Sequence, residues 1–541
     1  MVAAATYDFI LVGGGTAACV AAARLVAGGA SVLMLERGPR QASRIMHFPA
    51  GYMKFLERDT YLEMHRTEPQ PQLGGRAPIV PQGRVLGGGG TVNAMVYMRG
   101  HRADYADWNR AIGGDGRGEW NWDDLLPHYM AQEDNDHLGA PLHGVSGPLK
   151  VSHLAHTSPM TRAWLKTLQQ MGVAYTPDFN DGDPRGVGLM QHTIDWTTRR
   201  RCSPVDAFLD PVMRSPKLTV RSGATVERLC FDGERATGVR WKEAGAMHEA
   251  SCGEILLAAG AYQTPKLLML SGVGPEEELR RHGIAPRLVL PGVGANLQDH
   301  YECPVVATTN GAYGYFGQDR GLSMILAGLQ YLLFRSGPVT TTGVESCAFL
   351  SFGQAEDPAD IQMFCVPTVY LDRDVMGTPP GHGVTINSLL LRPRSRGHVR
   401  LRSADPEAAP VVDLQVFTHP DDLATTMKGF RFARSVLDQE PLRSLVAREI
   451  FPGPAVVSDD AVADHCRRTV KTGYHPVGTC AMGAADKPLA VVDRELRLRG
   501  CDGIRIIDAS MMPNIVSGNT NAAVMAVADK ASAMILAGRA H

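Results

Sequence analysis

Apolar runs near the start of the chain alternate with a glycine-rich helical pattern. Residues 7–12, YDFILV, and residues 31–36, SVLMLE, are short apolar runs of the kind that form buried strands. Between them, residues 13–29 begin with three glycines and continue with small and apolar residues at helical spacing. The pattern predicts a strand, a helix and a second strand, which is the unit that opens a dinucleotide-binding fold.

A different periodicity appears in the second half of the chain. Residues 397–403, GHVRLRS, alternate polar and apolar positions between turn signals, as a half-buried antiparallel strand does. Residues 419–441 follow with a helical pattern capped near HPDD, and residues 521–538 predict one helix with a broad apolar face. We therefore predict an α/β fold, α+β overall, in which a Rossmann-like nucleotide domain is interrupted by a domain built on an antiparallel sheet.

The segment closest to a membrane span is 321–334, GLSMILAGLQYLLF. Its apolar residues fall on more than one helical face, which fits a buried helix or one that touches a membrane, and we take the buried helix as the default. The segment is shorter than the ~20 residues that a spanning helix needs. The N-terminus shows no signal-peptide pattern. These features predict a cytoplasmic protein without a transmembrane segment, and they leave peripheral membrane contact open.

Composition narrows the function classes. A chain of 541 residues is too long for one ordinary core, so two domains are expected. The formal net charge of −2 gives no basic excess for nucleic acid. The ten cysteines form no C-x-x-C pair, so we expect neither a metal site nor a disulfide framework.

The first glycine-rich segment carries a phosphate-binding pattern. Gly13, Gly15 and Ala18 form G-x-G-x-x-A directly after the first predicted strand. The first glycine makes the turn, the second lets a pyrophosphate approach the backbone, and the third position packs helix on strand. Glu36 ends the second strand, where a carboxylate accepts the ribose hydroxyls of an adenosine. The order of elements favours a bound dinucleotide over an empty glycine-rich turn, but it does not separate NAD from FAD.

Two further segments distinguish these cofactors. Residues 83–100 read GRVLGGGGTVNAMVYMRG, and residues 260–274 read GAYQTPKLLMLSGVG. Both match signature patterns of the glucose–methanol–choline (GMC) oxidoreductases. The chain also resembles this family at PGVGANLQDH (291–300), GYHPVGTCAMG (473–483) and residues 508–532. The resemblance extends over most of the chain in the family's order and spacing.

The resemblance implies a FAD-dependent, choline dehydrogenase-like alcohol dehydrogenase that transfers hydride to flavin N5. It implies an FAD-binding domain of residues 1–155, 200–305 and 476–541, and a substrate-binding domain of residues 156–199 and 306–475. FAD is expected to be bound non-covalently, because Val92 stands where covalently linked relatives carry a histidine. The residues implied to line FAD are Gly13, Gly15, Thr16, Ala17, Glu36, Arg84, Gly89, Asn93, Ala94, Met95, Val96, Val226, Asp508, Ala509, Asn519 and Thr520.

His475 is the predicted catalytic base. An alcohol gives up hydride readily only as its hydroxyl loses a proton, and a neutral histidine can take that proton at physiological pH. The family places such a histidine over the flavin, and His475 matches it. Without the resemblance, a hydrogen-bonded core histidine would be the simpler interpretation. Asn519 matches the family's second catalytic position, where an amide can hold the substrate oxygen, although it can also cap the following helix.

Two further residues are candidates for substrate contact. Glu345 matches a position that lines the substrate cavity in relatives, and a paired or solvated acid fits its sequence context equally well. Tyr474 is expected to shape the pocket beside His475. Neither residue identifies the alcohol, and the oligomeric state also stays open.

The expected electron acceptor is a quinone or dye rather than O₂. In oxidase relatives the residue two positions before the histidine helps to shape an oxygen pocket, and here it is Gly473, which has no side chain. An oxidase that releases H₂O₂ is the first alternative. A hydroxynitrile lyase, a fatty-acid photodecarboxylase and a flavin-binding sensor protein are the others. The pair formed by His475 and Asn519 argues against the photodecarboxylase.

Overall fold

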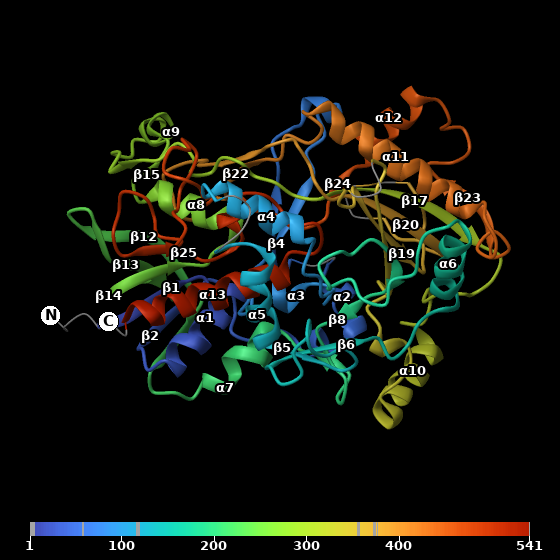
Figure 1. The fold of residues 1–541 in the computed structure, drawn as a ribbon, viewed down its shortest axis with the longest axis horizontal. Helices are drawn as coiled ribbons and strands as arrows, with labels where there is room; N and C mark the ends of the chain where they lie inside the picture. The colour runs from blue at the N-terminus through green and yellow to red at the C-terminus, as the bar shows by residue number, and fades with distance from the viewer. Residues whose placement is uncertain are drawn as a thin grey trace.

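The computed structural model describes residues 6–56, 59–114, 119–353, 357–371, 375 and 377–539. Part of the N-terminal segment examined for a signal peptide, residues 1–5, lies outside these residues. Figure 1 shows two large sheets at opposite sides of the molecule, with both chain ends beside the first sheet. Each sheet has seven strands.

The first sheet is mixed and contains the predicted opening unit. Its order is β11-β2-β1-β14-β13-β12, and β25 pairs with β14. The parallel part has β2 and β14 on either side of β1, with Phe9 opposite Val32 and Ile10 opposite Ile255. The strands are β1 (Thr6–Val12), β2 (Val32–Glu36), β11 (Leu218–Ser222), β12 (Ala224–Asp232), β13 (Arg235–Glu243), β14 (Ala246–Leu257) and β25 (Ile504–Ile506).

The second sheet is antiparallel throughout. Its order is β23-β17-β20-β19-β18-β7, and β24 pairs with β17. Three of its strands, β18, β19 and β20, are buried along their whole length. The strands are β7 (Gly186–Leu189), β17 (Tyr301–Thr309), β18 (Ser346–Leu350), β19 (Ile361–Val366), β20 (Gly383–Leu390), β23 (Val446–Phe451) and β24 (Lys471–Thr472).

Helices cover both sheets. In Figure 1, α1 and α13 lie beside the first sheet, while α11 and α12 lie along the second. The helices are α1 (Thr16–Ala27), α2 (Met53–Leu56), α3 (Gly89–Val92), α4 (Arg102–Ala111), α5 (Trp122–Gln132), α6 (Pro159–Gln170), α7 (Asp210–Val212), α8 (Gly260–Leu270), α9 (Glu276–Arg281), α10 (Gly321–Phe334), α11 (Pro420–Leu437), α12 (Asp459–Thr469) and α13 (Asn521–Arg539).

Small sheets complete the fold. They are formed by β3 (Leu62–Arg66) with β4 (Ile79–Gly83), β5 (Glu133–Asn135) with β6 (Leu149–His153) and β8 (Gln191–His192), β9 (Ile194–Asp195) with β10 (Arg200–Arg201), β15 (Val273–Gly274) with β16 (Leu288–Val289), and β21 (His398–Arg400) with β22 (Val411–Asp413).

The predicted fold class is confirmed, with local differences. The first strand, helix and second strand appear as β1, α1 and β2, and the helix predicted from residue 419 appears as α11, capped by the His419 side chain. The alternating segment 397–403 forms the shorter β21, which pairs only with β22 and lies outside the large antiparallel sheet. Strand β17 crosses the predicted domain boundary at residue 305. The division into two domains therefore stays a proposal, in which each domain is built on one of the two large sheets.

The prediction that residues 321–334 form a buried helix is wrong in one respect. The segment forms α10 over the predicted residues, but only Ala327 and Tyr331 are buried. Figure 1 shows α10 at the edge of the molecule below the second sheet. Within the described residues, no helix combines the length and apolar character needed to cross a membrane.

Candidate active site

One large cavity extends along the carboxyl ends of β1 and β2 and reaches the second sheet. Its volume is about 1050 Å³, and its walls include Leu35 from the first sheet and Phe364 and Leu389 from the second. Ligand pockets for a single drug-sized molecule have volumes of roughly 300–1,000 Å³. The cavity lies at the top of this range, so it can hold a large ligand.

Glu36 organises the glycine-rich turn at one end of the cavity. Its carboxylate accepts a hydrogen bond from the amide of Gly14 at 2.8 Å and one from Gly38 at 2.6 Å. Burial raises the pKa of Glu36, and these two amides act in the opposite direction. Gly13 has a φ of +95°, and a Cβ there would lie 2.6 Å from the carbonyl oxygen of Ala258, so only glycine fits this turn.

The second glycine-rich segment packs directly on the first. Gly88 has a φ of +53°, and a Cβ there would lie 2.9 Å from the Cα of Gly15. This contact brings the start of α3 next to the start of α1, so two helix N-termini face the same space. Such termini offer free amides and a positive dipole end to an anion.

A buried arginine fixes the end of α3. Arg201 donates to the side-chain oxygen of Asn93 at 2.8 Å and to its carbonyl oxygen at 2.7 Å. Asn93 Oδ1 also accepts the amide of Met95 at 3.0 Å. Burial lowers the pKa of Arg201 to about 10, which leaves the guanidinium charged at neutral pH. The positive charge lies behind the cavity wall near the site implied for the flavin.

Asp508 connects the second signature segment to the C-terminal part of the chain. Its carboxylate accepts the amide of Gly260 at 2.8 Å, the hydroxyl of Thr264 at 2.6 Å and the amide of Ser510 at 2.9 Å. Burial raises the pKa of Asp508, while these donors favour its ionised form. The start of α8 and the segment before α13 are thereby held on the same side of the cavity.

The backbone of His475 is anchored by a buried acid from a distant part of the chain. Asp299 accepts the amide of His475 at 2.8 Å and, through its other oxygen, the hydroxyl of Thr472. The amide of Gly473 donates to the carbonyl oxygen of His300 at 2.6 Å. The loop that carries His475 is therefore tied at successive residues to the segment that leads into β17.

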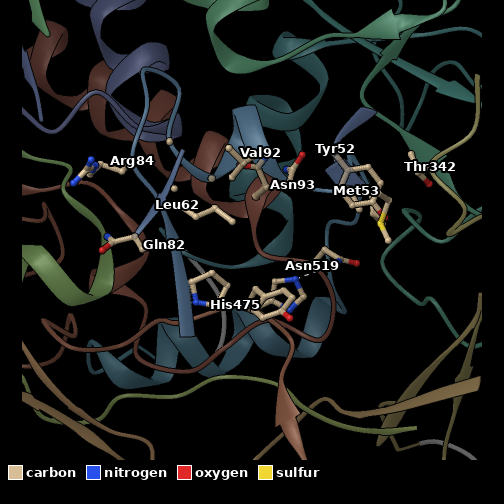
Figure 2. A pocket seen from close by; sticks show the side chains of 18 of the residues that line it. Tyr52, Met53, Leu62, Gln82, Arg84, Val92, Asn93, Thr342, His475 and Asn519 are labelled. Carbon is tan, nitrogen blue, oxygen red and sulfur yellow. Dashed lines mark hydrogen bonds between the residues drawn. The ribbon is translucent and has the colours of Figure 1, made fainter. Parts of the chain in front are cut away.

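The imidazole of His475 lies between two polar side chains. Its Nε2 is 3.0 Å from the side-chain nitrogen of Asn519, and its Nδ1 is 2.9 Å from the Nδ1 of His300. Figure 2 shows His475 and Asn519 beside each other, facing the space bordered by Leu62 and Val92. The Asn519 oxygen accepts from the buried amide of Gln362 at 3.5 Å, which directs the Asn519 nitrogen toward His475.

These contacts assign the tautomer of His475. The amide nitrogen of Asn519 can only donate, so Nε2 of His475 accepts and carries no hydrogen. In the neutral ring the hydrogen is then on Nδ1, where His300 accepts it. Burial lowers the pKa of His475 to about 4, and burial with the neighbouring His475 lowers that of His300 well below its ordinary value. His475 is therefore neutral at physiological pH, with the lone pair of Nε2 at the cavity wall, where it accepts from Asn519.

The cavity brings together nearly all the residues predicted to hold the cofactor. Met95 is the exception, because it is fully buried in a small cluster with Tyr52 and Ile194. Tyr474, predicted to shape the pocket, lines the cavity as well. The predicted residues on the cavity wall are Gly13, Gly15, Thr16, Ala17, Glu36, Arg84, Gly89, Asn93, Ala94, Val96, Val226, His475, Asp508, Ala509, Asn519 and Thr520.

Glu345 has a different setting from the one expected. It is buried and is not among the residues that line the cavity, although its neighbour Val344 is. Its carboxylate accepts the amide of Ser158 at 2.9 Å and the hydroxyl of Thr341 at 2.9 Å, together with the hydroxyls of Thr161 and Tyr315. These four donors occupy the carboxylate, so we do not assign Glu345 to substrate binding.

Sequence reasoning missed residues that complete the site. Tyr52, Met53 and Leu62 border the cavity near His475, and Figure 2 shows them around the same space. Nothing in their local sequence distinguishes them from core residues. Asp299 and His300 were within reach, because both end the segment PGVGANLQDH that carries part of the resemblance.

Helix α13 begins at Asn521, two residues after Asn519. The hydrogen bonds of the Asn519 side chain go to His475 and Gln362. Thr520, Asn521 and Val524 line the cavity, so the first turn of α13 faces it. The side chain of Asn519 is thus directed at the catalytic candidate, and Thr520 takes the position before the helix.

Comparison with known proteins agrees with this arrangement. The family model for GMC oxidoreductases matches residues 7–302 in its N-terminal part and residues 393–528 in its C-terminal part. The alcohol dehydrogenase [acceptor] of Pseudomonas putida is 36% identical over 98% of this chain and 96% of its own length. The oxygen-dependent choline dehydrogenase of Brucella anthropi is 34% identical over 98% of this chain and 95% of its own length.

A solved structure of similar shape comes from a study of FAD modification in the formate oxidase of Aspergillus oryzae RIB40. It has a TM-score of 0.90 and 26% sequence identity, and the match covers 99% of each chain. The family matches span the glycine-rich cavity wall at one end and the His475–Asn519 pair at the other. The chain belongs to the GMC oxidoreductase family and is an enzyme of that family.

Proposed function

We propose that this enzyme oxidises the CH–OH group of an alcohol to an aldehyde or ketone, with FAD as the hydride acceptor. The observation that carries the proposal is the geometry of His475. Its unprotonated Nε2 lies at the cavity wall, 3.0 Å from the Asn519 amide. A substrate hydroxyl placed roughly 3 Å from both nitrogens can replace their mutual hydrogen bond, donating to Nε2 and accepting from the Asn519 amide.

The residues of the cavity fit FAD. A Cβ on Gly15 would have its nearest neighbour at 3.6 Å, and one on Gly89 would meet no atom within 4 Å. Glycine at these two positions therefore keeps cavity space open next to the backbone amides, which suits a pyrophosphate. Glu36 lines the same cavity where an adenosine ribose would bind. Bound FAD would supply the flavin N5 atom that accepts hydride from the alcohol carbon.

The chain's own residues then handle the proton. His475 takes the hydroxyl proton at Nε2, which gives the oxygen the negative charge that favours loss of hydride from carbon. His300 accepts from Nδ1 and so holds the lone pair of Nε2 toward the cavity. Once protonated, His475 is a cation beside the reacting oxygen and stabilises its charge. Asn519 donates to the same oxygen and does not compete for the proton.

For the acceptor, we propose a quinone or a dye in preference to O₂. The space two residues before His475 is narrow, because a Cβ on Gly473 would lie 2.9 Å from Leu389 Cδ1 and 3.3 Å from His475 Nδ1, so a side chain there would require Leu389 to move. Gly473 itself provides no side chain that could shape an oxygen pocket at this place. The alternative is an oxidase that releases H₂O₂, and the similar choline dehydrogenase of Brucella anthropi carries the description oxygen-dependent.

The central prediction concerns the rate of flavin reduction. Replacing His475→Ala removes the base, and general-base catalysis typically contributes roughly 10²–10⁴ in rate, or about 3–5 kcal/mol of barrier. We expect a loss of that size in anaerobic stopped-flow mixing with alcohol, partly recovered at high pH where solvent supplies more alkoxide.

Two matched variants separate the roles of these residues. His475→Gln keeps a polar side chain but is no base, so it should stay slow in neutral buffer. Asn519→Ala should cost less than His475→Ala, since it removes one hydrogen bond. If His475→Ala reduces its flavin as fast as the parent at pH 7 while FAD stays bound, the histidine is structural.

The pH profile provides a second prediction. Burial lowers the pKa of His475 from the ordinary 6.5 to about 4. His475 therefore stays neutral as the pH falls through 6.5, and it becomes protonated only as the pH approaches 4. The acid limb of kcat/KM should therefore lie well below pH 6.5, and nitrogen NMR of labelled histidine should show His475 neutral at pH 6 with its hydrogen on Nδ1. A midpoint at or above 6.5 contradicts the assignment.

The third prediction concerns the cofactor bond. Val92 lines the cavity next to Asn93, and its side chain has no nucleophilic atom (Figure 2). Precipitating the holoenzyme with acid should therefore release yellow flavin into the supernatant. A flavoprotein with a histidyl-linked flavin, treated in parallel, should keep its colour in the pellet. Flavin that stays with this enzyme's pellet contradicts non-covalent binding.

The fourth prediction separates dehydrogenase from oxidase. The alcohol-reduced enzyme is mixed with air-saturated buffer or with a soluble quinone analogue, and recovery of the oxidised-flavin absorbance is followed. We expect the quinone to reoxidise the flavin much faster than O₂ does. Reoxidation by O₂ at or above the rate with quinone identifies an oxidase and overturns the proposed acceptor.

A further inference from the structure

Helix α10 concentrates apolar surface to an unusual degree. Half of the large apolar side chains that the described chain exposes belong to its fourteen residues. Leu322, Ile325, Leu326, Leu332, Leu333 and Phe334 are each between 55% and 73% exposed. Monomeric soluble proteins rarely keep a contiguous apolar patch of this kind in water, and such patches mark interaction sites.

The helix is attached to the protein along one narrow face. Tyr331 is buried, packs edge-on against Phe48 with ring centroids 5.2 Å apart, and donates to the carbonyl oxygen of Thr198 at 2.9 Å. Ala327, one turn earlier, is the other buried residue of the helix. At 100° per residue, the six most exposed apolar side chains of the helix cover an arc of roughly 200°.

The width of this arc favours a lipid phase over a protein partner. A partner helix or sheet covers one side of a helix, whereas the acyl region of a bilayer surrounds every side that is inserted. The sequence of α10 has no charged residue, so none would have to enter the lipid. Its length of 14 residues suits a helix that lies in the interface.

Positive charges border the helix where headgroups would lie. Arg320 precedes α10 and Arg335 follows it. The two neighbouring segments, which touch α10 through Phe48 and Thr198, carry the exposed Arg44 and Arg200. The acid at the start of the helix, Asp319, is paired with Lys54 at 2.6 Å and lies 3.6 Å from Arg320. This border is positive overall and complements anionic headgroups.

The same helix forms part of the wall of the cavity that contains His475. Arg320, Met324 and Ala327 line the cavity together with Ile45 and Phe48. A bilayer in contact with α10 would therefore lie next to this part of the cavity. An apolar alcohol or a quinone could then reach the site without crossing water.

We propose that α10 is a membrane-docking helix, which inserts its apolar arc into the surface of a bilayer that contains anionic phospholipids. Docking places the adjoining wall of the active-site cavity against the lipid. The proposal adds a binding surface to the proposed alcohol oxidation, and its test reads binding directly and does not depend on that activity.

The experiment is flotation of the holoenzyme with vesicles of phosphatidylcholine and phosphatidylglycerol. The test variant is Leu332→Glu with Leu333→Glu, two exposed residues outside the cavity wall. The matched control is Val457→Glu with Leu489→Glu, which are 69% and 50% exposed elsewhere on the surface. We expect the parent and the control to float with the vesicles, and the α10 variant to bind at least tenfold more weakly.

Charge is tested by Arg320→Gln with Arg335→Gln and by vesicles of phosphatidylcholine alone. Both changes should weaken binding at low salt. The substitutions remove positive charges from the protein, and the uncharged vesicles lack the negative charges of the headgroups. All variants should keep their flavin spectrum, and the α10 double variant should reduce a dye with a water-soluble alcohol as the parent does. This control separates loss of docking from loss of folding.

Three results would overturn the proposal. The parent could remain unbound with anionic vesicles, or the α10 variant could float as well as the control. Alternatively, sedimentation velocity could show that the parent is a dimer and the α10 variant a monomer, while neither binds vesicles. This face would then be an interface between two copies of the chain. A holoenzyme that floats but is reduced by no alcohol would refute the proposed reaction and leave the docking surface intact.

Discussion

The placement of one imidazole between two halves of the molecule governs the candidate site. His475 receives its backbone anchor and its Nδ1 partner from Asp299 and His300, just before β17, and its Nε2 partner from Asn519, just before α13. Strand β17 pairs with β24, and Tyr301 lies opposite Thr472. This pairing sets the distance between the segment of Asp299 and His300 and the loop that carries His475. Because these groups are buried, removal of one partner leaves another unsatisfied, at a cost of about 1–3 kcal/mol.

The nucleotide side of the cavity uses buried carboxylates in a similar way. Glu36 accepts the amides of Gly14 and Gly38, and Asp508 accepts those of Gly260 and Ser510. Each carboxylate therefore fixes a turn through its backbone and leaves the cavity space above the glycines free. In the proposed function, these amides and Glu36 would hold the dinucleotide, and the space near His475 would take the alcohol.

Local patterns predicted the parts of the fold that depend on neighbouring residues. The apolar runs of β1 and β2, the glycines between them and the cap of α11 at His419 are all encoded within a few positions. Nearly all of the cofactor-lining residues that the family motifs implied then lie on the cavity wall. What the motifs could not provide is the direction of individual side chains. Met95 turns into a separate cluster, and three of the four donors to Glu345 are distant from it in sequence.

Local patterns also could not predict the exposure of α10 or the role of His300. Periodicity showed that residues 321–334 are apolar on several faces, but whether other elements cover those faces depends on tertiary packing, and here only one narrow face is covered. His300 stands in a segment that carried the resemblance, yet its role appears only when β17 brings it within 2.9 Å of His475. The electrostatic consequence, a neutral base with a defined tautomer, follows from burial and geometry together.

The central claim is that this cavity, with FAD bound, oxidises alcohols. The most direct measurement is anaerobic mixing of the purified holoenzyme with a panel of aliphatic, aromatic and polyol alcohols while the oxidised-flavin absorbance is followed in the dark. The account predicts that at least one primary or secondary alcohol bleaches the flavin, and that the corresponding aldehyde or ketone appears in equal amount. A flavin that dithionite reduces but that no alcohol in the panel bleaches would contradict it.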